Sequence, residues 1–100
     1  MTLEDQYRTL VGAYYGVREM DEHELRIFIL KDIESYIKEF IESNPIPNFN
    51  YIEEAEKINT NLSLKRKLQD SLRILPEVNA PLEFILLVQK NLRTINDVER

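Results

Sequence analysis

The only histidine, His23, is the residue best suited to metal or acid–base chemistry in this sequence, and it stands between Glu22 and Glu24, with Glu19 one turn earlier. Side chains that are adjacent in sequence fan around a helix, so these groups cannot converge on one ion. The acidic residues fall on the outward faces of the expected helices, where nothing shifts their pKa values for catalysis. We therefore predict a solvated surface histidine and no metal site, cofactor or catalytic residue.

A second group that could do chemistry is basic: Lys65, Arg66 and Lys67 are consecutive, and Arg73 follows two turns after Arg66. Lys and Arg side chains on one helix can neutralise nucleic-acid phosphates. Asp70 dilutes this charge, the chain has a net charge of -5, and no zinc finger or aromatic RNA-binding motif is present. Our alternative hypothesis is therefore contact with nucleic acid through these four basic residues, in the manner of a helix-turn-helix, as a monomer or a dimer.

Other enzyme signatures are scarce. The chain has no cysteine and only two glycines, so it has no phosphate-binding glycine loop and no thiol nucleophile. Small helical mutases hold an anionic substrate with buried arginines, but the only arginines near an apolar face are Arg18 and Arg26, both at expected helix ends. Arginines there extend their charged heads to solvent. We predict that the protein is not an enzyme.

Length and composition indicate one helical domain covering residues 1–100. The chain is 43% hydrophobic and 31% charged, and no apolar run approaches the roughly 18 to 20 residues that span a membrane. The first five residues include two acids and lack the basic and apolar segments of a secretory signal. We therefore expect a cytoplasmic protein that does not enter membranes.

Apolar residues recur at helical spacing along most of the chain, which predicts an all-α fold, a compact bundle of four to five helices. Thr2 should cap the first helix, with Asp5 completing a capping box. Gly12 and Gly16 lie one turn apart on this helix. We expect the helix to end near Gly16, the alternative being a neighbouring backbone that approaches the glycine pair closely.

The remaining helices follow from caps and prolines. Asp21 should cap a long second helix that ends at Ser43, before an extended connector at residues 45–50. Asn50 should cap the third helix, and a change of apolar phase near residues 59–61 leaves open whether it continues as one bent rod. Pro76 should end the helix before it, and Pro81 should stand in the first turn of the last helix, which should lie in the middle of the bundle. The last helix should fray from about residue 94, the alternative being that Ile95 and Val98 extend its apolar stripe by one turn.

Several large apolar residues do not fit the inward faces. Ile27 and Phe28 project toward the polar side of the second helix, and Leu82 and Leu86 lie opposite the main apolar face of the last one. Tyr15 stands beside a tyrosine-rich stripe on the first. Because exposed aromatic and aliphatic side chains are typical anchors of interfaces, our leading hypothesis is a non-enzymatic protein–protein interaction module. Such a module could be an accessory subunit, adaptor or inhibitor that binds a larger protein; a homo-oligomer through the same faces is a third hypothesis.

Overall fold

The computed structural model describes the backbone of residues 1–20 and 23–98 and the side chains of this part through residue 95. The described residues form five α-helices and no strand, which confirms the predicted all-α bundle. The helices, with one short 3-10 segment before the last, are α1 (Leu3–Arg18), α2 (Arg26–Ser43), α3 (Tyr51–Asn61), α4 (Leu64–Ile74), η1 (Leu75–Val78) and α5 (Leu82–Val98). None of the described helices is long and apolar enough to cross a membrane.

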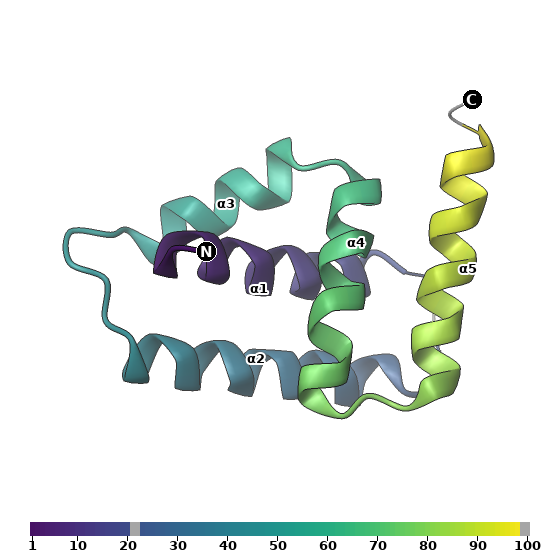
Figure 1. The fold of residues 1–100 in the computed structure, drawn as a ribbon, viewed down its shortest axis with the longest axis horizontal. Helices are drawn as coiled ribbons and strands as arrows, with labels where there is room; N and C mark the ends of the chain where they lie inside the picture. Colours follow the sequence, from purple (N-terminus) through teal and green to yellow (C-terminus); the bar gives the residue numbers. More distant parts are fainter. Residues whose placement is uncertain (21–22, 99–100) are drawn as a thin grey trace.

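Helix α1 occupies the middle of the fold (Figure 1). α2 runs antiparallel to it on one side, and α3 lies on the other. α4 crosses α1 steeply, and α5 runs antiparallel to α4 at one end of the molecule. The expectation that the last helix would be central is wrong, because its main packing partner is α4 alone whereas α1 packs against α2, α3 and α4.

Side-chain caps fix three of the helix starts. The hydroxyl of Thr2 accepts the amide of Asp5 at 3.1 Å, and the side-chain oxygen of Asn50 accepts the amide of Glu53 at 3.1 Å, both as predicted. Ser63 caps α4, and its backbone is extended. This extended residue separates α3 from α4, so they form two helices rather than one bent rod.

Helix α2 begins later than the sequence suggested. Its first residue is Arg26, and Leu25 at the cap position makes no side-chain capping bond. Asp21, the predicted cap, lies outside the described residues. The segment before α2 is fixed differently, because Arg26 donates through Nη1 to the carbonyl oxygen of Met20 at 2.8 Å. This bond joins the start of α2 to the chain just after α1.

Two groups of buried side chains make up the core. The larger includes Val17, Ile33, Leu68, Phe84 and Val88, all essentially inaccessible, and joins α1, α2, α4 and α5. The smaller joins α1 and α3 and consists of Tyr7, Val11 and Ile58, with Phe49 and Tyr51 packed on it. The apolar faces that the sequence pattern assigned to the helices therefore pack against one another in the core, as expected for amphipathic helices.

The glycine pair marks the crossing of α1 and α4. A Cβ on Gly16 would lie 2.5 Å from the carbonyl oxygen of Lys67 and would collide with the hydroxyl of Ser71, while one on Gly12 would collide with Asp70. The predicted end of the helix near Gly16 is wrong: α1 continues to Arg18, and the alternative of a closely approaching backbone holds. Glycine here creates space rather than a turn.

The last helix continues beyond residue 94. α5 continues to Val98, and the Thr94 hydroxyl donates to the carbonyl oxygen of Lys90 at 3.1 Å. Ile95 still packs on the larger core cluster. This apolar contact explains why the helix persists beyond the polar residues that suggested an end.

Candidate interaction surface and arginine cleft

The four predicted apolar anchors on α2 and α5 are exposed. Ile27, Phe28, Leu82 and Leu86 each have 52–68% of their surface accessible to solvent. No helix of the described structure covers them, so the sequence correctly identified apolar side chains left outside the core. We call these four residues the apolar surface.

Helix α5 leaves part of this surface uncovered because it packs from one side only. Phe84 and Val88, one turn apart, are fully buried against the larger core cluster. Leu82 and Leu86 lie on the other side of the same two turns. A helix that is apolar all round but packed at the edge of a fold must leave apolar atoms in water.

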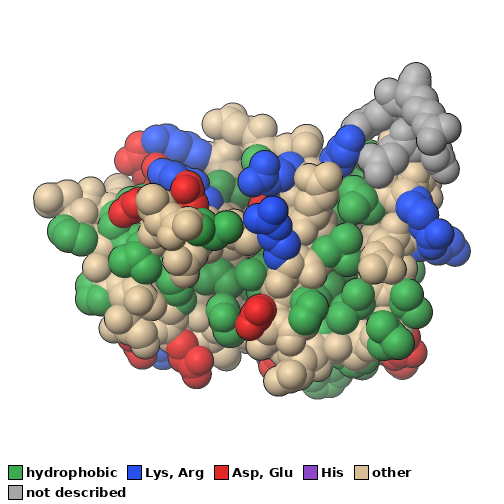
Figure 2. Space-filling view, viewed as in Figure 1, with side chains coloured by type: hydrophobic (Ala, Val, Ile, Leu, Met, Phe, Trp, Pro, Cys, Tyr) green, Lys and Arg blue, Asp and Glu red, His purple; other side chains and the backbone are tan. Residues whose placement is uncertain are grey.

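The two halves of the apolar surface lie at the same end of the molecule. The rings of His23, just before α2, and Phe84, in the first turn of α5, are in edge contact with centroids 5.6 Å apart. Figure 2 shows hydrophobic side chains gathered over the lower part of α5 and the adjoining end of the molecule. The fold therefore brings together residues that are more than fifty positions apart in the sequence.

Tyr15 does not belong to this exposed set. It is half-buried, packs on the smaller core cluster and makes an edge contact with Tyr14 at 5.4 Å between centroids. The guanidinium carbon of Arg18 lies 6.0 Å from its ring centroid, within cation–π range. These contacts give Tyr15 a structural role in the seam between α1 and α3.

His23 is not a freely solvated side chain, contrary to our prediction. It is half-buried, and its Nδ1 accepts the amide of Leu25 at 3.1 Å. The imidazole thus satisfies one of the free amides that precede α2. Among the described residues, no group of three or more His, Asp or Glu side chains is arranged to hold a metal ion.

Lys67 is not part of an exposed basic patch, contrary to our prediction, because it is buried. Only 3% of the residue is exposed, and its ammonium group donates to Oε1 of Glu19 at 2.8 Å and to the carbonyl oxygen of Asn59 at 3.0 Å. It therefore cannot contact phosphate as we expected. Of the other predicted basic residues, Arg66 and Arg73 are exposed, and Lys65 is half-buried.

Asp70 is also buried, which corrects the expectation that every acidic residue faces outward. It is 3% exposed in the seam where α4 meets Gly12. Burial raises the pKa of Asp70 above its ordinary value, and the positive charges of Arg66 and Arg73 only partly oppose this. The glycine pair on α1 and polar residues on the facing side of α4 were the sequence signal for such a seam.

An open cleft lies where the start of α1 meets α4. It has a volume of about 390 Å³, and its charged lining consists of Arg8, Arg66, Arg73, Asp5 and Asp70. Figure 2 shows Lys and Arg side chains over α4 on this face, with acidic side chains nearby. We call this hollow the arginine cleft.

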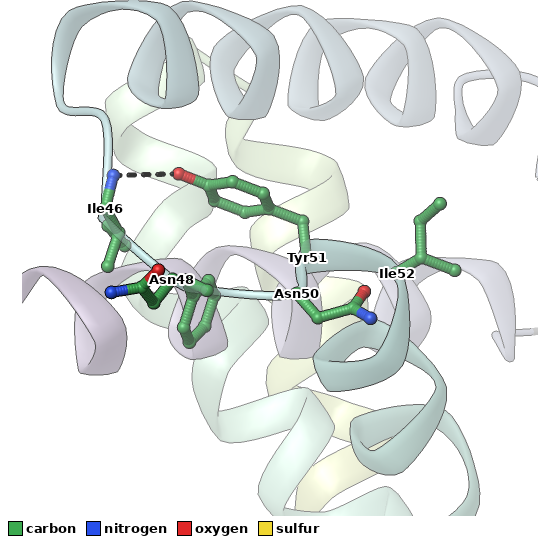
Figure 3. Close-up of a pocket in the computed structure, with 6 residues that line it drawn as sticks. Ile46, Asn48, Asn50, Tyr51 and Ile52 are labelled. Carbon is green, nitrogen blue, oxygen red and sulfur yellow. Dashed lines mark hydrogen bonds between the residues drawn. The ribbon is translucent and has the colours of Figure 1, made fainter.

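A second hollow, beside the connector before α3, offers less chemistry (Figure 3). Ile46, Phe49 and Tyr51 line it together with two asparagines. The Tyr51 hydroxyl accepts the amide of Ile46 at 3.0 Å, so this polar group already holds the connector in place. Ile52, on the rim, is 75% exposed and stands on α3.

Comparison with protein-family models, curated proteins and solved structures finds no match to this chain.

Proposed function

We propose that the protein is a non-enzymatic interaction module that binds a larger protein through the apolar surface. The observation that carries this proposal is the exposure of Ile27, Phe28, Leu82 and Leu86, each more than half accessible. A large aromatic side chain held on a helix is a typical anchor, because it buries much area with little loss of conformational freedom.

The chemistry of the surrounding surface supports the same proposal. Glu24, Lys31, Asp32 and Glu83 are exposed near these residues in the sequence and provide a polar rim. Interfaces commonly combine an apolar centre with a charged edge, which excludes water from the centre and selects the partner. An accessory subunit, adaptor or inhibitor would use such a surface.

Site-specific photocrosslinking in the native cells tests this proposal. A photoreactive phenylalanine analogue replaces Phe28 in one variant and Leu86 in a second; a third carries it at Ile52, which is equally apolar and exposed but stands on α3. We expect the same crosslinked protein from positions 28 and 86 and none from position 52.

Two results would contradict the proposal. Absence of any adduct from positions 28 and 86 would leave the apolar surface without a partner. Equal adducts from all three positions would mean that exposed apolar groups are captured without specificity. An adduct of twice the chain's mass would identify the partner as a second copy and support the homo-oligomer instead.

The nucleic-acid alternative has weaker support. Lys67 is buried, and Nε of Arg66 lies 3.4 Å from Oδ1 of Asp70. Nuclease treatment before crosslinking distinguishes the two hypotheses, since adducts that depend on nucleic acid would disappear.

A further inference from the structure

We propose that the arginine cleft binds a phosphate group, either as free phosphate or as a small phosphate monoester. Arg8 of α1 and Arg66 and Arg73 of α4 line this hollow together. Its charged side chains are three arginines and two aspartates, a local balance of +1, whereas the whole chain carries -5. The lining of the cleft is thus slightly positive in an otherwise acidic protein, although Glu54 outside the lining also pairs with Arg8. This site is separate from the apolar surface.

Much of the donor capacity of these arginines is available. Arg8 uses Nη1 for Asp5 at 3.0 Å and Nε for Glu54 at 3.2 Å. Arg66 uses Nε toward Asp70 and keeps its two terminal nitrogens. Arg73 makes no ion pair with any residue that the structure describes, although its charge acts on Asp70. Each guanidinium has five N–H donors, so several remain for a ligand.

The neighbouring carboxylates hold the arginines in place. Asp70 is buried between α1 and α4, beside Gly12. Its Oδ1 lies 3.4 Å from Nε of Arg66 and so helps to orient this guanidinium. Asp5 and Glu54 pair with Arg8 at 3.0 and 3.2 Å and orient it in the same way, although Asp5 is exposed. Preorganised donors lose less conformational freedom when a ligand binds.

The arrangement fits a phosphate group better than a carboxylate or a nucleic-acid strand. A carboxylate has two oxygens and is satisfied by one guanidinium fork, whereas a phosphate group offers at least three oxygens to arginines on two helices. A nucleic-acid strand needs a row of positive charges along its backbone. Here Asp5, Asp70 and Glu54 interrupt any such row.

A ligand titration of the full chain, monitored by two-dimensional NMR of the backbone amides, tests this proposal. Inorganic phosphate and phenyl phosphate are added separately at constant ionic strength, and sodium chloride serves as the reference. We expect saturable shifts in residues 5–9 and 66–73 and none with chloride. Tighter binding of phenyl phosphate would identify an ester as the ligand, and tighter binding of inorganic phosphate would identify the free anion.

Three variants make the test specific. Arg73→Gln should weaken binding about tenfold, the size of one lost charged hydrogen bond. Arg93→Gln removes an exposed arginine from α5 and should leave binding unchanged. Asp70→Asn removes a repelling charge but keeps a side-chain oxygen that can accept from Nε of Arg66, so binding should tighten several-fold. Circular dichroism checks that each variant is folded.

The proposal is overturned if chloride produces the same shifts, if Arg93→Gln weakens binding as much as Arg73→Gln, or if no saturable shift occurs. A single-stranded oligonucleotide that binds more tightly than both phosphates, with a steep salt dependence, would also overturn it in favour of an extended nucleic-acid interface.

Discussion

The ammonium nitrogen of Lys67 lies 2.8 Å from Oε1 of Glu19 and so joins the first turn of α4 to the residue that follows α1. The same nitrogen donates to the carbonyl oxygen of Asn59 on α3 at 3.0 Å. One buried cation thus connects three helices. Such a group is costly to bury unless its partners remain in place.

Removing the counterion of this cation should destabilise the fold. We expect Glu19→Gln to lower the free energy of unfolding by about 1–2 kcal/mol, less than for a fully buried pair because the Glu19 side chain is 37% exposed and water can partly replace it. Urea denaturation measures this change. Glu53→Gln, which breaks an exposed pair with Lys57 on α3, is the control and should change stability by less than about 0.5 kcal/mol. Equal effects of the two variants would contradict the account.

The crossing of α1 and α4 predicts a difference between the two glycines. Gly16→Ala should cost about 2–4 kcal/mol, because its Cβ would meet the backbone of Lys67, which cannot move without shifting α4. Gly12→Ala should cost less, because its main obstacle is the side chain of Asp70. Thermal unfolding of both variants provides the measurement.

A second substitution provides the control for Gly12→Ala, because it removes the side chain that the new Cβ would meet. In the Gly12→Ala background, Asp70→Ala deletes the carboxyl group and should restore part of the lost stability. If alanine at position 16 were instead neutral or stabilising, as helix propensity alone predicts, the close approach of the helices would be wrong.

Two phenylalanines distinguish the core from the apolar surface. Phe84→Ala should lower the free energy of unfolding by about 3–5 kcal/mol, because the ring is fully buried. Phe28→Ala should change it by less than about 0.5 kcal/mol, because that ring is 64% exposed. Denaturant titration of both compares the same substitution in two environments. A large loss for Phe28→Ala would place this ring in the core.

The hydroxyl of Tyr7 should resist ionisation. Burial raises the pKa of Tyr7 to about 12, and its hydroxyl donates to the carbonyl oxygen of Tyr51 at 2.7 Å. Since the unfolded chain ionises near 10, the native state binds more protons between these values, and stability falls as the pH rises through this range. Burial also raises the pKa of Tyr14. Titration of tyrosinate absorbance should therefore show a late ionisation near 12 that is lost in Tyr7→Phe. Ionisation of all five tyrosines near pH 10 in the folded protein would contradict this.

Periodicity and caps were enough to predict an all-α bundle, but not the end of α1 or the start of α2. Thr2 and Asn50 act locally, so their roles can be read from a few residues, and the outward position of Phe28 follows from its place on the helical wheel. The buried polar residues where α4 crosses α1 were harder to predict from the sequence. Lys67 and Asp70 are of types that ordinarily face solvent, and their burial depends on α4 lying against Gly12 and Gly16, which are distant in sequence.

The place of α5 also could not be read from its own residues. An apolar helix can be central or can lie at an edge with an uncovered face, and only tertiary packing decides between them. Phe84 and Val88 would be buried in either case. The exposure of Leu82 and Leu86 depends on the edge position of α5, and the proposed interaction surface in turn depends on this exposure.

The proposal that the apolar surface binds a protein partner is tested most directly by quantitative affinity capture from nuclease-treated native cells. The captured proteins are compared for the tagged wild type, the double variant Phe28→Ser/Leu86→Ser and the control Ile52→Ser. We predict that one stoichiometric partner is retained by the wild type and the control and is lost from the double variant, which remains folded. Retention of that partner by the folded double variant would contradict the proposal.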